Sequence, residues 1–359
     1  MKSEIYEKLR ERLDRFPLGA PAADEAYDIL ATLFTEEEAR IALDLPPFPE
    51  SIASICEKTG MEKEKLVPVL DRMSSKGLVF SNVRDGVRRY SLLPMVPGIF
   101  ELQFMKGEYG PEKSRLAKLF DEYYVTGWGK ATFDLKTSWA RVIPVEKQIP
   151  AGTQVFTYEK ASELIENASS LALTNCFCRH EAELLGKSCG APKDVCMILG
   201  PFADFTVERG FAERASKQQM MDALARSEEA GLVHCSDNCR DRINFICNCC
   251  GCCCGILGSI TKLNIPTAVA TSRYIASIDE ELCDGCGTCV ERCHVSALSL
   301  VDDVARHAGA HRCIGCGLCA SACPSDAIAM IERPDAREPK RSFRELITEI
   351  AVERGKFGA

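Results

Sequence analysis

Cysteine placement is the feature that most constrains how this chain can fold. Of its 21 cysteines, all but Cys56 lie between Cys176 and Cys323, so a thiol-poor N-terminal part precedes a thiol-rich remainder. The first residues are charged throughout, unlike a secretory signal, and no apolar stretch approaches the roughly 20 residues of a membrane helix. We therefore expect a cytoplasmic protein without a membrane span. A reducing cytosol keeps thiols free, so thiols this closely spaced indicate metal binding.

Two four-cysteine runs near the C-terminus share the spacing C-x2-C-x2-C-x3-C. Three thiolates at this spacing can wrap three corners of a cubane, whereas zinc sites prefer separated C-x2-C pairs. In the bacterial two-cluster arrangement, the fourth cysteine of each run ligates the other cluster. The sequence therefore predicts two 4Fe-4S clusters with crossed ligands. Cluster 1 takes Cys283, Cys286, Cys289 and Cys323, and cluster 2 takes Cys313, Cys316, Cys319 and Cys293.

Short apolar segments that we expect to be strands flank these runs, at residues 274–278, 297–300 and 327–330. With them, residues 273–332 resemble bacterial two-cluster ferredoxins. The resemblance departs at His294, because a proline usually follows the fourth cysteine. Proline donates nothing to iron, so we expect ligation to survive this change.

Twelve more cysteines lie between Cys176 and Cys254. Adjacent cysteines in a strand point to opposite faces, so only one or two per local run can meet the same cluster. We expect one or two further clusters, with the remaining thiols buried as small apolar side chains or packed around the ligands. The alternative is that most of these thiols are merely buried. The candidate ligands are Cys176, Cys178, Cys189, Cys196, Cys247, Cys249, Cys250, Cys252, Cys253 and Cys254.

A strand at residues 171–173 is expected to lead into Cys176 and Cys178, whose thiols would share one face. Cys189 and Cys196 follow across a loop that contains glycine and proline. This loop spacing favours convergence of the four thiols, which we expect to supply most ligands of one site. Residues 247–254 would complete that site or build a second one, with Gly251 allowing a tight bend.

These elements together are similar to a family of anaerobic bacterial iron–sulfur proteins. That family carries C-x-C-R…C…C, then GL-x-H-x3-N, then ICNCC-x-CCC and then a two-cluster ferredoxin. All of these occur here in that order, the second beginning at Gly231 and ending at Asn238. The resemblance implies electron transfer and additional clusters, without identifying the middle ligands. His234, in the second motif, is either a ligand or proton donor, or a hydrogen-bonded structural residue.

Residues 27–92 read as helix, helix, helix and hairpin, which is the order of a winged helix. Thr35 and the acidic residues after it form a good helix start, and Asp85 and Gly86 form a hairpin turn. Residues 35–90 contain nine basic and ten acidic residues, and the chain has a net charge of −8. Phosphate binding needs a clear basic face, so we expect a docking or scaffold role rather than binding of nucleic acid.

We therefore predict an α+β chain of five parts. Residues 1–110 form a winged-helix-like domain with an N-terminal helix, and residues 111–155 form a connecting arm. Residues 156–272 form a cysteine-rich α/β region that binds clusters, and residues 273–332 form the two-cluster ferredoxin domain. Residues 333–359 form a tail helix.

The leading functional hypothesis is an electron-transfer protein, or the electron-wiring subunit of an anaerobic redox complex. One alternative is a reductase whose middle cluster binds substrate, and the other is a redox-sensing regulator whose winged helix binds DNA. No G-x-G-x-x-G follows a strand and no G-x4-G-K-[ST] is present, so no nucleotide or flavin site is indicated. The expected partners are redox proteins, with a flavoenzyme among the candidates.

Overall fold

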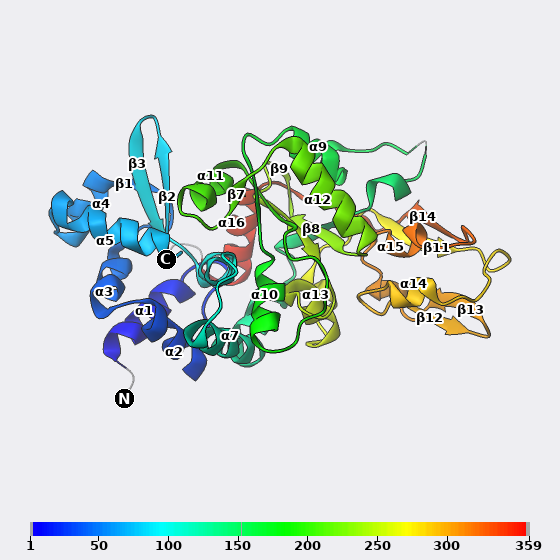
Figure 1. Cartoon of the computed structure of the whole chain (residues 1–359), viewed down its shortest axis with the longest axis horizontal. Coiled ribbons are helices and arrows are strands. Elements are labelled where there is room, and N and C mark those ends of the chain that lie inside the picture. The colour runs from blue at the N-terminus through cyan, green and yellow to red at the C-terminus, as the bar shows by residue number, and fades with distance from the viewer. Residues whose placement is uncertain (1–2, 152, 357–359) are drawn as a thin grey trace.

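The computed structural model describes residues 3–151 and 153–356. The molecule is elongated, with the N-terminal helices at one end, a thiol-bearing sheet in the middle and the two four-cysteine runs at the other end (Figure 1). Helices and strands are mixed throughout, so the α+β prediction is confirmed at this level. No helix among the described residues is long and apolar enough to cross a membrane.

The N-terminal unit has helices packed beside a three-stranded sheet of order β1-β3-β2. Thr35 begins α3 with a capping box, in which its side chain accepts from the Glu38 backbone and Glu38 caps Thr35 in return. Asp85 and Gly86 both adopt positive φ at the hairpin turn, as predicted. The winged-helix assignment itself stays a prediction. The elements are α1 (Glu4–Asp14), α2 (Asp24–Leu33), α3 (Glu36–Asp44), β1 (Glu50–Ser51), α4 (Ile52–Thr59), α5 (Lys63–Ser75), β2 (Val79–Arg84) and β3 (Val87–Leu92).

Residues 95–133 connect the N-terminal unit to the central sheet through helices that share an aromatic core. Phe100 lies at its centre, with ring centroids 4.8 Å from Phe120, 5.3 Å from Trp128 and 5.6 Å from Phe177. This packing fixes the side of the central region where the thiols gather. The elements are the irregular turn η1 (Met95–Ile99), α6 (Phe100–Phe104), α7 (Pro111–Tyr123), η2 (Tyr124–Trp128) and α8 (Gly129–Phe133).

The central region is an antiparallel six-stranded sheet of order β4-β8-β10-β6-β5-β7. Cys247 in β10 lies opposite Cys235 in β8, so pairing brings distant thiols together. β4 lies within residues 111–155, which we had predicted to be a connecting arm, and pairs with β8 at the sheet edge. The predicted domain boundaries themselves stay predictions. The strands are β4 (Ala140–Ile143), β5 (Leu171–Thr174), β6 (Cys196–Leu199), β7 (Glu213–Arg214), β8 (Val233–Asp237) and β10 (Phe245–Cys249).

Helices and short turns surround this sheet and carry several of the cysteines to its end. α10 begins directly after Cys176, so the chain turns from strand into helix between Thr174 and Phe177. The remaining elements are η3 (Glu146–Gln148), η4 (Thr157–Glu159), α9 (Ala161–Glu166), α10 (Phe177–Leu184), α11 (Gly200–Glu208), α12 (Lys217–Glu229), α13 (Gly255–Thr261) and η5 (Pro266–Ala268).

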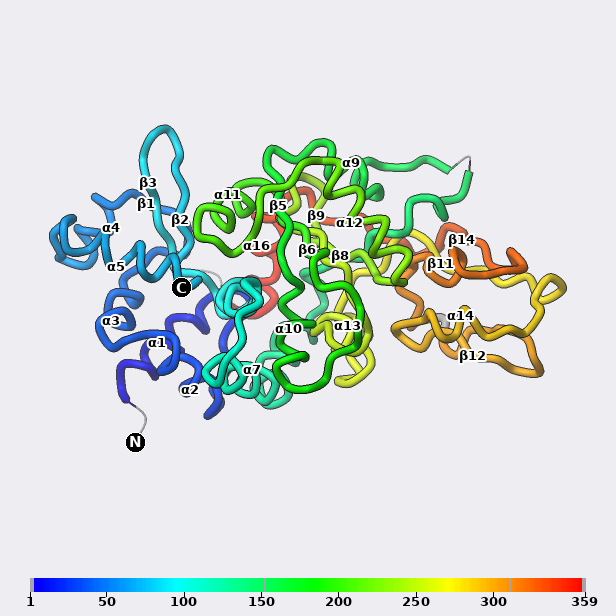
Figure 2. Tube along the Cα trace, viewed as in Figure 1, coloured from blue at the N-terminus to red at the C-terminus, as the bar shows by residue number. Residues whose placement is uncertain are grey.

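Residues 274–332, here called the ferredoxin unit, form the end of the molecule opposite the N-terminus (Figure 2). β11 pairs antiparallel with β14 and β12 pairs with β13. β11, β12 and β14 lie where the sequence predicted short strands, whereas β13 was not predicted. Each four-cysteine run contains a short helix that carries its third cysteine. The elements are β11 (Tyr274–Ile278), α14 (Thr288–Glu291), β12 (Leu298–Val301), β13 (Val304–His307), η6 (Ala310–Arg312), α15 (Leu318–Ser321) and β14 (Ile328–Glu332).

The C-terminal segment returns from the ferredoxin unit to the far side of the molecule. β15 (Lys340–Ser342) pairs in parallel with β9 (Cys239–Asp241), and α16 (Phe343–Glu353) follows. Leu346 and Ile350 are fully buried, as their apolar stripe indicates. Arg354 donates to the carbonyls of Leu18 and Ala131, each at 2.6 Å. The residue that follows α16 therefore contacts both the N-terminal unit and the segment that precedes the central sheet.

Candidate metal centres

The thiols assigned to cluster 1 surround one small cavity in the ferredoxin unit. Cys283, Cys286 and Cys289 line it from the first run, and Cys323 lines it from the second. Gly285 has positive φ, and a Cβ there would lie 2.4 Å from the carbonyl oxygen of Asp303, so the first run needs glycine to pack this closely. The geometry agrees with the crossed ligand set, which itself stays a prediction.

The thiols assigned to cluster 2 lie deeper, next to the central region. Burial and the neighbouring thiols of Cys313 and Cys293 raise the pKa of Cys319 to about 12. A bound cation reverses this effect, because a coordinating thiol is deprotonated. The backbone N–H of Val145 donates to the Cys316 carbonyl at 2.9 Å, which ties the second run to the segment after β4.

Backbone N–H groups point at the sulfurs of both predicted clusters. Ala297 donates to Sγ of Cys293 at 3.1 Å, and Ala305 donates to Sγ of Cys283 at 3.4 Å. Such N–H···S bonds favour the thiolate form and help to set the reduction potential of a cluster. The residues of the ferredoxin unit therefore fit two cubanes.

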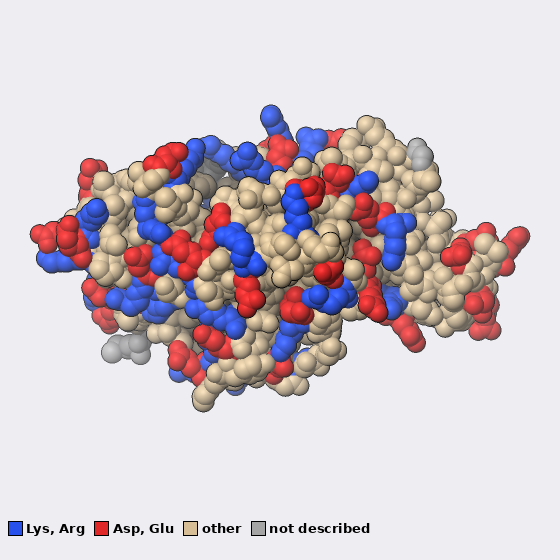
Figure 3. All heavy atoms as spheres, turned by 45° about the horizontal axis from the view of Figure 1, so that its top comes forward, with Lys and Arg blue, Asp and Glu red and all other residues tan. Residues whose placement is uncertain are grey.

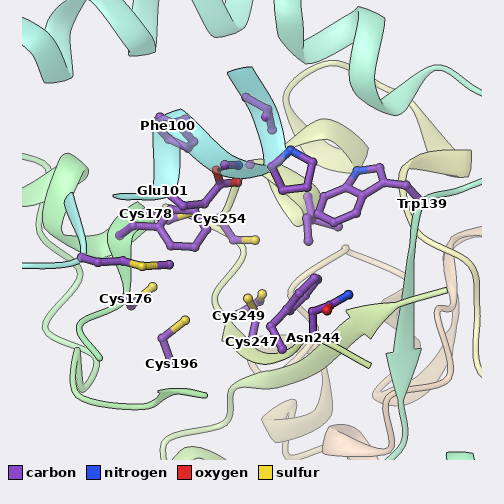
Figure 4. A pocket seen from close by; sticks show the side chains of 18 of the residues that line it. Phe100, Glu101, Trp139, Cys176, Cys178, Cys196, Asn244, Cys247, Cys249 and Cys254 are labelled. Atoms are coloured by element: carbon purple, nitrogen blue, oxygen red, sulfur yellow. Dashed lines mark hydrogen bonds between the residues drawn. The ribbon is translucent and has the colours of Figure 1, made fainter. Parts of the chain in front are cut away.

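A second group of thiols lines an apolar cavity of about 270 Å³ in the central region, here called the thiol cavity. Its walls include Phe100, Trp128 and Trp139. Figure 4 shows the sulfurs of six cysteines facing this common space, and they come from the start of α10, from β6, from β10 and from the turn before α13. The six are Cys176, Cys178, Cys196, Cys247, Cys249 and Cys254.

Three charged residues, Glu101, Arg179 and Asp237, also line the thiol cavity. Burial raises the pKa of Glu101 to about 7, although its carboxylate accepts from the backbone of Gly98 at 2.6 Å. Arg179 is 3% exposed. Burial lowers its pKa, but the thiols of Cys176 and Cys250 outweigh burial and raise it. The R of the C-x-C-R motif was the only sequence signal for Arg179, and Glu101 had none.

A third group of thiols lies at the turn after β10 and is here called the four-thiol group. It consists of Cys189, Cys250, Cys252 and Cys253, whose Sγ atoms all lie within 4.8 Å of one another. Cys189 and Cys252 are exposed, whereas Cys250 is buried and also borders the thiol cavity. Thiols that are neighbours in the sequence therefore lie in different groups. Cys249 and Cys254 line the thiol cavity, whereas Cys252 and Cys253, on the turn at residues 251–253, belong to the four-thiol group.

This grouping differs from the expected convergence of Cys176, Cys178, Cys189 and Cys196. Three of them line the thiol cavity, but Cys189 lies in the four-thiol group. α10 and the loop after it carry Cys189 away from the cavity and across to the turn. Cys176 precedes the helix and Cys178 lies within it, so their proximity comes from a helix start rather than from one face of a strand.

His294 joins the turn of the four-thiol group to the ferredoxin unit. Its Nδ1 accepts from the backbone N–H of Gly251 at 3.2 Å, and its Nε2 lies 2.6 Å from the Gly231 carbonyl oxygen. These contacts fit a neutral ring protonated at Nε2. A Cβ on Gly251 would lie 2.6 Å from the His294 carbonyl oxygen, so glycine permits this approach. Histidine at position 294 makes these two hydrogen bonds through its ring, which proline could not do.

His234 lies among the strands and is not one of the residues that line the thiol cavity. Nδ1 of its buried ring is 2.5 Å from Oδ1 of Asn248, and Asn248 donates to the Val195 carbonyl at 2.6 Å. Among the alternatives for His234, these contacts favour the hydrogen-bonded structural residue.

Comparison with known proteins agrees with the C-terminal geometry. Residues 276–330 match the family model of the 4Fe-4S dicluster domain. No curated protein and no solved structure matches the chain. The matched segment contains both four-cysteine runs, and further thiols are clustered outside it. Together these findings support an iron–sulfur electron-transfer role, with a 4Fe-4S dicluster domain at residues 276–330.

Proposed function

We propose that this chain is the electron-wiring subunit of an anaerobic redox complex. It passes single electrons between a further iron–sulfur centre in the thiol cavity and the two clusters of the ferredoxin unit. The observation that carries the proposal is the His294 contact. His294 directly follows Cys293, a predicted cluster 2 ligand, and its ring bonds to Gly251 between two thiol-bearing residues. Covalent and hydrogen bonds thus connect the two thiol-rich regions.

The order of the centres follows from their positions. Cluster 2 lies beside the central region, whereas cluster 1 lies towards the outer end, where Cys286 is exposed. In Figure 3, acidic side chains gather at this end of the molecule. A redox partner with a basic surface suits it, because complementary charge speeds association. The exposed acidic residues of the ferredoxin unit include Asp279, Glu280, Glu281, Asp284, Asp302 and Asp303, of which Glu280 pairs with Arg306.

The thiol cavity also favours a second candidate function, reduction of a small substrate. Its volume of about 270 Å³ is close to the smallest ligand pockets, at about 300 Å³. Glu101 is a buried carboxyl in the wall of this cavity, which suits the delivery of a proton. A centre there would supply the electrons, and this chain's own residues would bind the substrate and exclude water.

The third hypothesis, a DNA-binding regulator, is the least supported. Asp71 of α5 pairs with Arg209 at 2.7 Å, and Arg88 of the hairpin pairs with Glu208 at 2.6 Å. Phe80 of β2 stacks on Phe202 of α11. These contacts engage α5 and the hairpin within the molecule, which favours a scaffold role for the N-terminal unit.

Iron and acid-labile sulfide measured on the anaerobic full-length protein test the cavity centre. The double variant Cys178→Ala/Cys254→Ala should lose about four irons and four sulfides, the content of one cubane. The matched control is Cys56→Ala, which removes a half-buried thiol of the N-terminal unit and should leave both contents unchanged. Unchanged iron in the double variant would show that the cavity thiols are structural.

Rapid-mixing reduction followed by EPR tests the connection. His294→Pro restores the residue usual in ferredoxins and removes the hydrogen bonds to Gly251 and Gly231. All clusters should remain, but the ferredoxin unit and the cavity centre should reach redox equilibrium more slowly than in the wild type. The control is His311→Pro, which changes another histidine of the ferredoxin unit, in the short helix η6. Equal equilibration rates in all three proteins would contradict wiring through His294.

A further inference from the structure

The four-thiol group has the dimensions of a site for one metal ion. Sγ of Cys189 lies 3.9 Å from Sγ of Cys250, and Sγ of Cys252 lies 3.7 Å from Sγ of Cys253. Four thiolates at the Zn–S distance of about 2.3 Å stand about 3.8 Å apart at the corners of a tetrahedron. The two observed separations agree with that value, and no pair exceeds 4.8 Å.

A cubane does not fit the same sulfurs. Its four irons occupy separate corners of a cube and each carries its own cysteine on the outside, so the thiolates stand much further apart. We propose that Cys189, Cys250, Cys252 and Cys253 bind a single tetrahedral metal ion, zinc or iron, and not an iron–sulfur cluster. Of its four ligands, only Cys250 also borders the thiol cavity.

The charges around the group agree with such a site. A divalent ion with four thiolates carries a net charge of −2, which needs compensation where it is buried. Arg179 lies beside Cys250. Its Nε and one terminal nitrogen are buried without a hydrogen-bond partner among the described residues. Lys262 donates to the Cys252 carbonyl at 2.7 Å and adds a second positive charge at the turn.

The site would join the loop after α10 to the turn after β10, beyond the point where β6 pairs with β10. Cys189 lies in the loop after α10, and the other three cysteines lie on the turn between β10 and α13. A closed set of four thiolates is typical of structural metal sites. The ion would hold the turn in place while Gly251, within it, contacts His294. Exposed Cys189 and Cys252 leave one side open for loading of the metal.

The intact protein offers the first test, because it requires no variant to fold. Iron, zinc and acid-labile sulfide are measured per chain after anaerobic purification. If only cubanes are present, iron equals sulfide and no stoichiometric zinc is found. The proposal expects one metal in excess of sulfide, either one zinc or one additional iron. Equal contents without zinc would overturn it.

The variants Cys189→Ser and Cys252→Ser assign that excess metal to the site. Each should lose one metal and no sulfide, and EPR signals of the ferredoxin clusters should be unchanged. Cys239→Ser is the matched control, because Cys239 is buried away from the group and contacts the carbonyl of Asp241. Loss of about four irons with four sulfides would show a cubane, and unchanged metal would show that these thiols bind none.

Zinc and iron are then distinguished on the wild-type protein. A single iron among four thiolates absorbs visible light and is paramagnetic, whereas zinc has a filled d shell and does neither. Replacement by Co²⁺ should give ligand-field bands of a tetrahedral tetrathiolate, which are lost in Cys252→Ser and retained in Cys239→Ser. Octahedral Co²⁺ bands would contradict the proposed geometry.

Discussion

The ferredoxin unit and the central region both gather thiols, but they do so in different ways. In the ferredoxin unit, two runs have the same spacing, and Cys323 of the second run lines the cavity formed by the cysteines of the first. In the central region, a helix start, two strands and a turn contribute to the thiol cavity. A site built from one local run can be predicted from its spacing. A site built by strand pairing depends on the whole fold.

The two regions also treat charge differently. The ferredoxin unit directs backbone N–H groups of Ala297 and Ala305 at its sulfurs. The central region places the buried guanidinium of Arg179 between the thiol cavity and the four-thiol group. Backbone donors are spread through the fold, whereas one side chain can be removed by one substitution. The central region is therefore expected to be the more sensitive to a single change of charge.

The largest expected effect concerns the crossed ligands. Cys293→Ala should remove the cluster built on Cys313, Cys316 and Cys319, a loss of about four irons per chain. The cluster beside it in sequence, on Cys283, should remain. Iron and sulfide analysis with EPR of the reduced protein measures this, and Cys56→Ala serves as control. Damage confined to the Cys283 cluster would break the comparison, because each run would then hold its own cluster.

Replacement of Arg179 tests the difference in charge. Arg179→Met keeps much of the side-chain volume but leaves the nearby thiolates without a buried cation. Metal affinity in the central region should fall by about 10- to 100-fold, as for other groups that support metal ligands. Competition with a chelator measures this for each metal. Arg179→Lys keeps the positive charge but lacks the planar guanidinium with its several N–H donors. Its metal affinity should therefore fall less than that of Arg179→Met. An equal loss from the ferredoxin unit would contradict a local effect.

The contact between the two regions can be strained without touching a thiol. Gly251→Ala puts a Cβ about 2.6 Å from the His294 carbonyl oxygen, so the turn must shift. We expect a loss of about 1–3 kcal/mol in the free energy of unfolding, the usual cost of overpacking. Anaerobic denaturant titration measures it. At Gly255 a Cβ would meet its nearest atom at 3.5 Å, so Gly255→Ala should cost less. Equal costs would place the strain elsewhere.

The smallest expected effect lies at the outer end of the ferredoxin unit. Neutralising exposed Glu281 and Asp302, as Glu281→Gln/Asp302→Asn, should slow electron exchange with a basic redox protein by a few-fold at low ionic strength. Cytochrome c is a suitable probe, followed by stopped-flow absorbance. Salt should remove the difference. Glu7→Gln, on exposed α1 at the other end, is the control. A rate that is independent of both charge and salt would exclude electrostatic docking at this end.

Much of the local structure could be predicted from the sequence. The cap at Thr35, the hairpin turn at Asp85 and Gly86, and the strands of the ferredoxin unit all depend on neighbouring residues, and each is observed. The four-cysteine runs likewise matched the dicluster domain at residues 276–330. These features share one property, since the residues that cause them lie within a few positions of one another.

The middle sites could not be predicted in the same way. Cys189 joins Cys250 across 61 positions of the chain, because the loop after α10 folds over the turn. Glu101 reaches the thiol cavity from α6, in a region where the sequence showed no pattern. The paired strands that put Cys235 opposite Cys247 could not be inferred from spacing either. Tertiary packing makes these contacts, and a single sequence does not display it.

The packing of α16 against the N-terminal end has a consequence for biosynthesis. A chain leaves the ribosome N-terminus first, so α16 emerges after every cysteine of the printed sequence. Arg354 therefore reaches Leu18 and Ala131 only after every cysteine has already been translated. Until then the strand β9, which β15 later covers, is open along one edge. We therefore expect the thiol cavity, which Phe343 of α16 helps to line, to be closed on that side only after all the cysteines that line it have been translated.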